Sequence, residues 1–441
     1  MSIPRWRKYV TKIIASEISS FSRYFDQLIQ MNILKHDGGF LFHAVECHQK
    51  IQLLDEDELP DLSQQKKQRT LILFNGTFNH IYDIQELLTH LKPQLSRSTR
   101  IVAVTYNPYY KWLYWLANRL GIRKPELPFT FITRTDLHNL SKLSGFDVVK
   151  LRPIIFFPFE WKGIGTFINR LFPTLPFFRN LGLVNIIVLR AIIPEKEHPS
   201  LSVVIPARNE EGNIENALKR MPRLDGVDLE IIFVEGHSTD RTWDEILRVK
   251  KQYSSQFNIK AFQQTGKGKG DAVRLGFSHA TRDLLTILDA DLTMPPEQLG
   301  RFCEAYCMGL ADFINGSRSV YPMEDNAMRF LNTLGNVFFA KALSYILETK
   351  LTDSLCGTKL LSAHDYQRFL SWREDFGDFD PFGDYELLFP AAIIPLSIID
   401  IPIRYMNRTY GSTNINRFRH GLMLFKMVWM GFFRVKMGRI R

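Results

Sequence analysis

Cysteines are scarce in this sequence, and their spacing excludes two kinds of structural site. The 441 residues include only Cys47, Cys303, Cys307 and Cys356. Cys303 and Cys307 are one helical turn apart, but no second Cys or His pair completes a zinc ligand set, and no disulfide framework is visible. Buried, reduced thiols are therefore expected, as in a cytoplasmic protein.

Long apolar runs are also absent. A membrane-spanning helix needs roughly 18–20 consecutive apolar residues, whereas the stretch 387–399 is too short and 422–433 contains Lys426. The first twelve residues carry four basic side chains with no apolar core after them, so no signal peptide is expected. These features predict a cytoplasmic protein, with any membrane contact peripheral and at the inner face.

The bulk composition is that of a folded protein. Hydrophobic residues make up 45% and charged residues 23%, which excludes disorder over most of the chain. The net charge of +10 leaves two interpretations open, attraction to phosphorylated or lipid partners and simple solubility. Nothing in the sequence indicates a nucleic-acid partner.

Two α/β regions follow one another along the chain. In the first, expected strands 71–74, 101–105 and 146–151 alternate with helices 83–91 and 135–143, the second helix capped by Thr135, while residues 1–70 carry little information. In the second, expected strands 202–206, 230–235 and 283–288 alternate with helices from 213 and 242. We predict domains at 1–192 and 201–420, a linker at 193–200 and a basic amphipathic segment at 421–441.

The strongest chemical signal is Leu288-Asp289-Ala290-Asp291. Two carboxylates spaced i, i+2 at the end of an apolar strand reach the same cleft, where they can hold Mg²⁺ or Mn²⁺ against a sugar-nucleotide diphosphate. Such a triplet alone is weak, because Asp is common in turns.

Its context is an ordered series of motifs. They are Val203-Val204-Ile205-Pro206-Ala207-Arg208-Asn209-Glu210-Glu211, Val234-Glu235-Gly236-His237-Ser238-Thr239-Asp240, Gly266-Lys267-Gly268-Lys269-Gly270, Gly316-Ser317-Arg318, Asp353-Ser354-Leu355-Cys356-Gly357-Thr358-Lys359 and Arg408-Thr409-Tyr410-Gly411-Ser412. Together they resemble family 2 glycosyltransferases of the GT-A fold, in the dolichol- and polyprenyl-phosphate mannosyltransferase branch.

The resemblance implies roles for individual residues. Asp289 and Asp291 match the metal site. Arg318 and Asp384 match catalytic positions; Asp384 would act as a base for a sugar hydroxyl or would orient a phosphate acceptor, which is already anionic. The implied nucleotide-sugar-binding residues are Pro206, Ala207, Arg208, Glu210, Glu235, Lys269, Asp289, Arg408 and Ser412.

Four positions depart from the family pattern. Arg208 replaces an aromatic residue, and Glu235-Gly236 replaces an Asp-Asp pair, which puts the base and the sugar in doubt. Thr293 stands where a third metal-facing side chain is common. Lys359 replaces an arginine and so loses the planar fork that grips phosphate.

The resemblance implies an inverting, hexosyltransferase-type enzyme that moves a sugar from a nucleotide-diphosphate sugar to polyprenyl phosphate or a related membrane-linked acceptor. A soluble saccharide acceptor and a non-catalytic scaffold remain alternatives. Processive synthesis is disfavoured, because the Gln-x-x-Arg-Trp motif is absent.

The N-terminal region resembles the second half of a class I methyltransferase, a partial Rossmann-like fold. The matching segments are 71–77, 83–93, 101–108, 135–146 and 179–190. The glycine-rich loop that cradles S-adenosylmethionine is missing, so the resemblance implies a degenerate, non-catalytic domain.

Two segments are expected to contact a membrane surface or, for the first, to pack in the core. Residues 328–347 are apolar but broken by polar residues, and residues 421–441 combine Phe, Met and Trp with five basic side chains.

Overall fold

The computed structural model divides into two compact units, each described here by itself. The N-terminal unit comprises Met1–Ile193, Ile393–Pro395 and Phe432–Arg441, and the C-terminal unit comprises Pro194–Ala392 and Leu396–Gly431. The structure describes residues 4–31, 39–53, 59–65, 67–121, 128–195, 199–322, 330–377, 380, 383–408, 410–411 and 417–437.

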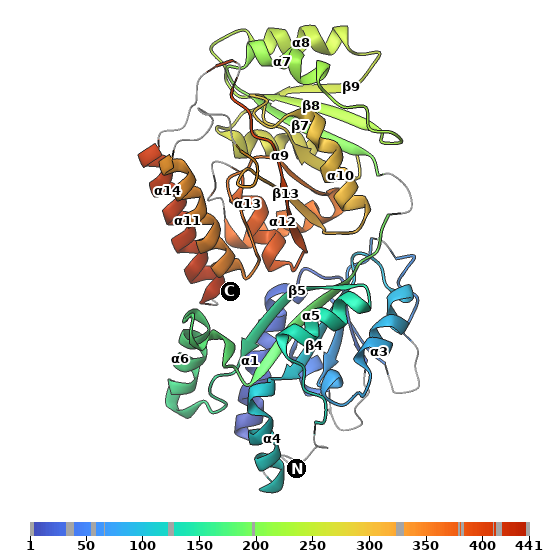
Figure 1. Ribbon diagram of the computed structural model, residues 1–441, viewed down its shortest axis with the longest axis vertical. Coiled ribbons are helices and arrows are strands. Elements are labelled where there is room, and N and C mark those ends of the chain that lie inside the picture. Colours follow the sequence, from blue (N-terminus) through green and yellow to red (C-terminus); the bar gives the residue numbers. More distant parts are fainter. Residues whose placement is uncertain are drawn as a thin grey trace. The chain divides into compact units, whose positions relative to one another are not determined.

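The N-terminal unit is built on a six-stranded sheet with the order β2-β1-β3-β4-β6-β5; Figure 1 labels β4 and β5 of this sheet. Its strands are β1 (Gln27–Met31), β2 (Gln49–Leu53), β3 (Thr70–Asn75), β4 (Arg100–Tyr106), β5 (Phe146–Ile154) and β6 (Val184–Ala191). β6 runs antiparallel to both neighbours, and the other pairs are parallel. The carboxyl ends of β4 and β5 therefore lie at the same sheet edge as the start of β6.

The helices described in this unit are α1 (Arg5–Ser22), α2 (Phe40–Ala44), α3 (Ile84–Leu91), α4 (Lys111–Arg119), α5 (Arg134–Leu143) and α6 (Ile164–Leu171). Of these helices, the sequence predicted only α3 and α5. α1 and α2 precede residue 70. The predicted cap of α5 was wrong by two residues, because Thr133 forms a reciprocal capping box with Asp136 and so satisfies two backbone donors at once.

The C-terminal unit contains a seven-stranded sheet with the order β13-β11-β12-β10-β7-β8-β9. Its strands are β7 (Leu201–Ala207), β8 (Leu229–Glu235), β9 (Asn258–Gln263), β10 (Leu284–Ile287), β11 (Phe313–Ser317), β12 (Lys359–Ser362) and β13 (Ile398–Pro402). Of the strands described, only β12 is reversed. The amino end of β12 therefore lies at the edge where the others have their carboxyl ends.

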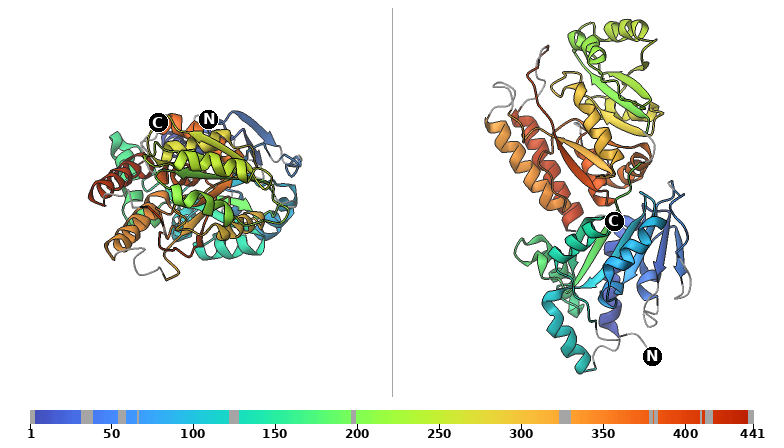
Figure 2. Two further views of the ribbon diagram at one scale, coloured as in Figure 1. Left: turned by 90° about the horizontal axis from the view of Figure 1, so that it is seen from above. Right: turned by 45° about the vertical axis from the view of Figure 1, so that its right-hand side comes forward.

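Helices flank this sheet. They are α7 (Glu211–Lys219), α8 (Thr242–Gln252), α9 (Lys269–His279), α10 (Leu299–Cys307), α11 (Phe330–Leu347), α12 (Ala363–Phe376), α13 (Tyr385–Ile393) and α14 (Arg417–Gly431), with a π-helical turn at Phe432–Lys436. α7 and α8 pack together on one face and α9 on the other (Figure 1). α11 and α14 lie side by side in both views (Figures 1 and 2). The segment expected to begin at 421 thus starts inside α14.

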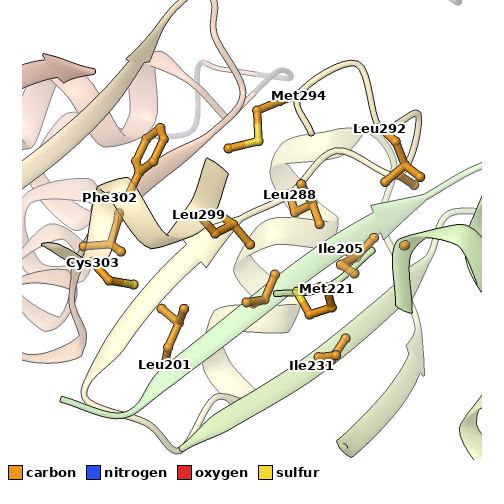
Figure 3. Packing of buried hydrophobic residues seen from close by; sticks show 14 of the residues in the cluster. Leu201, Ile205, Met221, Ile231, Leu288, Leu292, Met294, Leu299, Phe302 and Cys303 are labelled. Atoms are coloured by element: carbon orange, nitrogen blue, oxygen red, sulfur yellow. The ribbon is translucent and has the colours of Figure 1, made fainter. Parts of the chain in front are cut away.

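Buried aliphatic side chains hold the strand ends that carry the motifs. Ile205 of β7 and Leu288 after β10 are fully buried, with Leu292 and Met294 close by in the same cluster (Figure 3). Since apolar burial is the main favourable term in folding, this core fixes the loop on which Asp289 and Asp291 stand.

Gly276 lets α9 approach β7 closely. A Cβ atom there would lie 2.3 Å from Cγ1 of Val204, a branched side chain that adapts poorly. We expect Gly276→Ala to reduce the free energy of unfolding by about 1–3 kcal/mol through overpacking, measured by chemical denaturation. The matched control is Gly335→Ala in α11, where a Cβ meets nothing within 4 Å; it should stabilise the helix by about 0.5–1 kcal/mol. Equal effects at both sites would contradict this account.

Candidate active site

The candidate active site lies at the carboxyl edge of the C-terminal sheet. Parallel strands bring their ends to one edge, and ligands of open α/β sheets bind there. The first loop follows β7, Asp289 and Asp291 follow β10, and Arg318 follows β11. Lys359 reaches the same edge from the reversed strand β12. The topology therefore assembles side chains that are far apart in the sequence, from the loop after Ala207 to Lys359.

The two motif carboxylates each hold a cationic side chain. Lys269 Nζ, at the start of α9, lies 2.5 Å from Asp289 Oδ1, and Arg408 Nη2 lies 2.5 Å from Asp291 Oδ2. Thr293 donates from its backbone nitrogen and from Oγ1 to Asp291 Oδ1, at 3.1 and 2.8 Å. Thr293 thus orients the Asp291 carboxylate.

Opposing effects act on the pKa of Asp289. Burial works to raise the pKa, but the positive charges of Lys269, Lys359 and Arg318 outweigh it, and the pKa lies below its ordinary value. The charged form of Lys269 is favoured as well. Burial alone would lower the pKa of its amine, but the neighbouring carboxylates Asp289 and Asp384 raise it. Both groups are therefore charged at neutral pH.

Arg318 is fixed by a two-pronged ion pair. Its Nε and Nη2 donate to Asp353 Oδ2 and Oδ1 at 2.7 and 2.9 Å, and its backbone nitrogen donates to Oδ2 at 3.1 Å. The guanidinium also stacks over the ring of Tyr405, with its carbon 5.4 Å from the ring centre. Such a bidentate pair fixes the orientation of the fork. Asp353, which is fully buried, was not among the predicted site residues.

Lys359 and Asp384 form a second buried pair. Lys359 Nζ donates to Asp384 Oδ1 at 2.7 Å and also to the carbonyl of Cys356. Neither side chain is more than one-tenth exposed. The sequence marked Lys359 only as a departure from the family pattern and did not place it in the site. The structure brings it directly onto Asp384, a predicted catalytic residue.

Glu210 stands between the first loop and Arg408. Its Oε2 accepts from Asn213 at 2.7 Å, and its Oε1 is 3.5 Å from Arg408 Nη1. Burial raises the pKa of the Glu210 carboxyl to about 7, although Asn213 and Arg408 act in the opposite direction. Glu210 is thus a buried acid that titrates near neutrality, bridged through Arg408 to Asp291.

The remaining predicted residues surround this centre. Pro206 and Ala207 end β7, and Arg208 is exposed beside them. Both oxygens of buried Glu235 have internal partners, the Ser238 backbone nitrogen at 2.5 Å and Gln263 Nε2 at 3.0 Å. Glu235 therefore shapes the turn after β8. Ser412 lies outside the described residues.

The carboxylates fit a divalent cation of the Mg²⁺ or Mn²⁺ type. No cluster of three or more acidic, His or Cys ligands occurs among the residues that the structure describes. Mg²⁺ is commonly held by one or two carboxylates together with substrate phosphates and water. Asp289 and Asp291 supply two such carboxylates, and each already pairs with a positively charged side chain. This donor set therefore suits Mg²⁺ or Mn²⁺.

Comparison with known proteins finds a family profile that matches the part of the chain carrying most of this site. Residues 202–369 match the profile described as glycosyl transferase family 2. Over this range the C-terminal unit is similar to family 2 glycosyltransferases. Three curated relatives are polyprenyl-phosphate sugar transferases by name.

The relatives differ in how much of their length is matched. The dolichol-phosphate mannosyltransferase of Pyrococcus furiosus is 38% identical over 27% of this chain and 33% of its own length. The dolichyl-phosphate hexose transferase of Haloferax volcanii is 29% identical over 52% and 92%. The undecaprenyl-phosphate 4-deoxy-4-formamido-L-arabinose transferase of Edwardsiella ictaluri is 28% identical over 51% and 63%. The chain thus spans only a third of the first relative.

Solved structures resemble the chain weakly. Glucosyl-3-phosphoglycerate synthase from Mycobacterium tuberculosis, with Mn²⁺, uridine-diphosphate-glucose and phosphoglyceric acid, is 18% identical with a TM-score of 0.39 over 54% of this chain and 80% of its own. S. aureus TarS in complex with UDP-GlcNAc is 16% identical, with a TM-score of 0.38 over 54% and 67%. Likeness at this level carries no inference about this chain.

The pKa of Glu210 predicts a pH dependence of stability. Since the folded value of about 7 exceeds the ordinary value of 4.5, the contribution of Glu210 is fully present below pH 4.5 and is lost as pH rises through 7. We expect the free energy of unfolding of the wild type to fall by on the order of 1–3 kcal/mol between pH 5 and 8 because of this group. Glu210→Gln should remove that fall. Denaturant titrations across this pH range test it. Exposed Glu304→Gln is the control, and parallel profiles for wild type and Glu210→Gln would refute the prediction.

Proposed function

We propose that this chain is an inverting glycosyltransferase of the hexosyltransferase type, which moves a sugar from a nucleotide-diphosphate sugar to polyprenyl phosphate or a related membrane-linked acceptor. The observation that carries the proposal is the pair Asp289 and Asp291, ringed at the sheet edge by Lys269, Arg408 and Lys359. The mixed sheet and the family 2 match support a GT-A fold for this unit.

The charges of the site suit a diphosphate leaving group. A bound Mg²⁺ or Mn²⁺, held by Asp289 and Asp291, would neutralise charge that develops on the departing diphosphate. Lys269 and Arg408 now neutralise these two carboxylates. If the carboxylates held a metal cation instead, both side chains would become available for phosphate oxygens. Arg318 differs, because its fork is held by both oxygens of buried Asp353 and stays fixed.

The acceptor side of the reaction falls to Asp384 and Lys359. In an inverting transfer, an acceptor oxygen attacks the anomeric carbon from the face opposite the diphosphate, and the nucleoside diphosphate leaves with the bonding electron pair. An acceptor phosphate is already ionised and gives up no proton. For such an acceptor, Lys359 supplies positive charge and Asp384 orients it, whereas a hydroxyl acceptor would require Asp384 as the base.

Helices α11 and α14 support peripheral membrane contact in the C-terminal unit. Leu334 and Phe338 of α11 and Leu422, Phe425 and Trp429 of α14 are exposed apolar side chains. A lipid-linked acceptor keeps its tail in the bilayer, so such a surface would hold the enzyme at its substrate. In the part of the chain that the structure describes, no helix is long and apolar enough to cross a bilayer. We propose a cytoplasmic enzyme at the inner face of the membrane.

The proposal is tested by supplying donor and acceptor together. Purified protein with Mn²⁺ or Mg²⁺ is screened against labelled nucleotide sugars, with polyprenyl phosphate or a soluble oligosaccharide as acceptor. Label that moves into the organic phase supports the lipid acceptor. Label that stays on the oligosaccharide supports the soluble alternative, and no turnover of any donor would favour a scaffold.

Asp291→Ala should abolish metal-dependent transfer, at least about a 100-fold loss of kcat/KM, because one of two metal-holding carboxylates is removed. The fold should persist, since the side chain lies in a polar site and not in the core. The matched control is Asp283→Ala, at the opposite end of β10, where the carboxylate binds Ser200. Turnover by Asp291→Ala at saturating metal would disprove the assignment.

The N-terminal unit should not bind S-adenosylmethionine. We propose that it is a degenerate, non-catalytic methyltransferase-like domain, because the glycine-rich loop that lets backbone approach the cofactor is absent from the sequence. Isothermal titration calorimetry of the full chain should give no heat of binding. Micromolar affinity would instead indicate a bifunctional enzyme.

A further inference from the structure

The N-terminal unit exposes an unusually aromatic surface at one edge of its sheet. Trp112 and Trp115 of α4, Trp161 before α6, Ile164 and Phe167 of α6, and Phe177 form this aromatic surface. Phe177 is 81% exposed, and Trp161, Phe167 and Trp112 are each about 65% exposed. α4 has no buried residue at all, although four of its nine residues are Trp or Leu. Apolar side chains gathered in this way mark an interaction site.

The two halves of this surface belong together. α4 follows the carboxyl end of β4, and residues 155–183 connect the carboxyl end of β5 to the start of β6, so both leave the same sheet edge. Tyr110 Oη donates to the Leu181 carbonyl at 2.6 Å, and Asn107 Nδ2 donates to the Gly182 carbonyl at 2.7 Å. These bonds tie the base of α4 to the end of the second segment.

The first turns of α1 join the same region. Tyr9 Oη is 3.2 Å from Thr166 Oγ1 and accepts from Asn169 Nδ2 at 3.2 Å, and both of these partners lie on α6. Arg5, Arg7, Lys8 and Lys12 are exposed around this contact. Beside α1 lies an open hollow of about 550 Å³, lined by Arg7, Lys8 and Lys12 and also by Glu46.

Charge identifies the kind of partner. Residues 5–12 contain four Lys or Arg, residues 107–121 contain two and residues 155–183 contain three, whereas Glu160 is the single acidic residue in these ranges. A second copy of the chain would bring like charges against like. Trp, Tyr and Phe with adjacent cations suit a bilayer interface, where the rings enter the headgroup layer and the cations meet anionic lipid.

We propose that the aromatic surface of the N-terminal unit docks onto an anionic lipid bilayer. This is separate from the contact proposed for α11 and α14, and it gives the N-terminal unit a role that requires no cofactor. The claim concerns lipid binding and not sugar transfer. If the N-terminal surface does not bind lipid, the proposed transferase activity is unaffected. If the transferase activity is absent, the lipid binding is unaffected.

The test is co-sedimentation of the full chain with vesicles of phosphatidylcholine, either alone or mixed with phosphatidylglycerol. Trp112→Ser/Phe167→Ser should bind the mixed vesicles at least about tenfold more weakly than the wild type, because two large rings no longer enter the interface. Leu143→Ser removes an exposed apolar side chain at the opposite edge of the sheet, before the start of β5, and should bind like the wild type. All the substituted residues are more than half exposed, and thermal unfolding checks that folding is unchanged.

Leu422→Ser/Trp429→Ser separates this surface from α14. If α14 alone binds the vesicles, Leu422→Ser/Trp429→Ser loses binding and Trp112→Ser/Phe167→Ser keeps it. That result would overturn the proposal. Equal binding to neutral and mixed vesicles would also overturn it, because the charges would then have no part. Self-association of the wild type without vesicles, abolished by Trp112→Ser/Phe167→Ser, would assign the surface to a second copy instead.

Discussion

The ion pair between Lys269 and Asp289 joins the start of α9 to the end of β10, and the neighbouring chain segments conform to it. At Gly357 a Cβ atom would lie 2.2 Å from Asp289 Oδ2 and 2.3 Å from Lys269 Nζ, so a larger residue there would have to displace the ends of this ion pair. Lys359 follows two residues later and meets Asp384. The close packing of Gly357 against the Lys269–Asp289 pair thus positions the segment before β12. Through the Lys359–Asp384 pair, it also positions the start of α13.

Charge compensation extends this constraint to the whole site. Asp291 is paired with Arg408, Asp353 with Arg318 and Asp384 with Lys359. Breaking one of the two most buried pairs, Arg318–Asp353 or Lys359–Asp384, leaves an unpaired charge, which costs several kcal/mol, roughly 3–5 in measured cases. Under the proposed function, a donor that brings both a divalent cation and a diphosphate would replace both partners of a pair at once. Such an arrangement would favour binding of metal and diphosphate together over either alone.

Residues on the parallel strands were predictable and those on the reversed strand were not. An apolar run that ends in Asp289 and Asp291 marks a strand end at the ligand edge, which the sequence displays directly. Lys359 begins its strand, and its place at that edge follows only from the reversal of β12. β1 was missed for another reason: Gln27 and Gln30 are buried in it, and Gln27 bonds Thr70, so the strand does not read as apolar.

The C-terminal segment was predicted as apolar and basic, but the sequence did not reveal which side chains face solvent. Leu424, Met427 and Val428 are buried, while Leu422, Phe425 and Trp429 remain outside. Among the described basic residues after His420, Lys426 is exposed, Arg434 is half-buried and Lys436 is 3% exposed, its backbone carbonyl near Arg152. The buried ammonium of Lys436 is poorly placed to meet lipid headgroups, so among these three residues Lys426 and Arg434 carry the electrostatic attraction. Residues 5–12, 107–121 and 155–183 of the N-terminal unit contain nine further cations, so a dependence of membrane binding on anionic lipid can draw on both units.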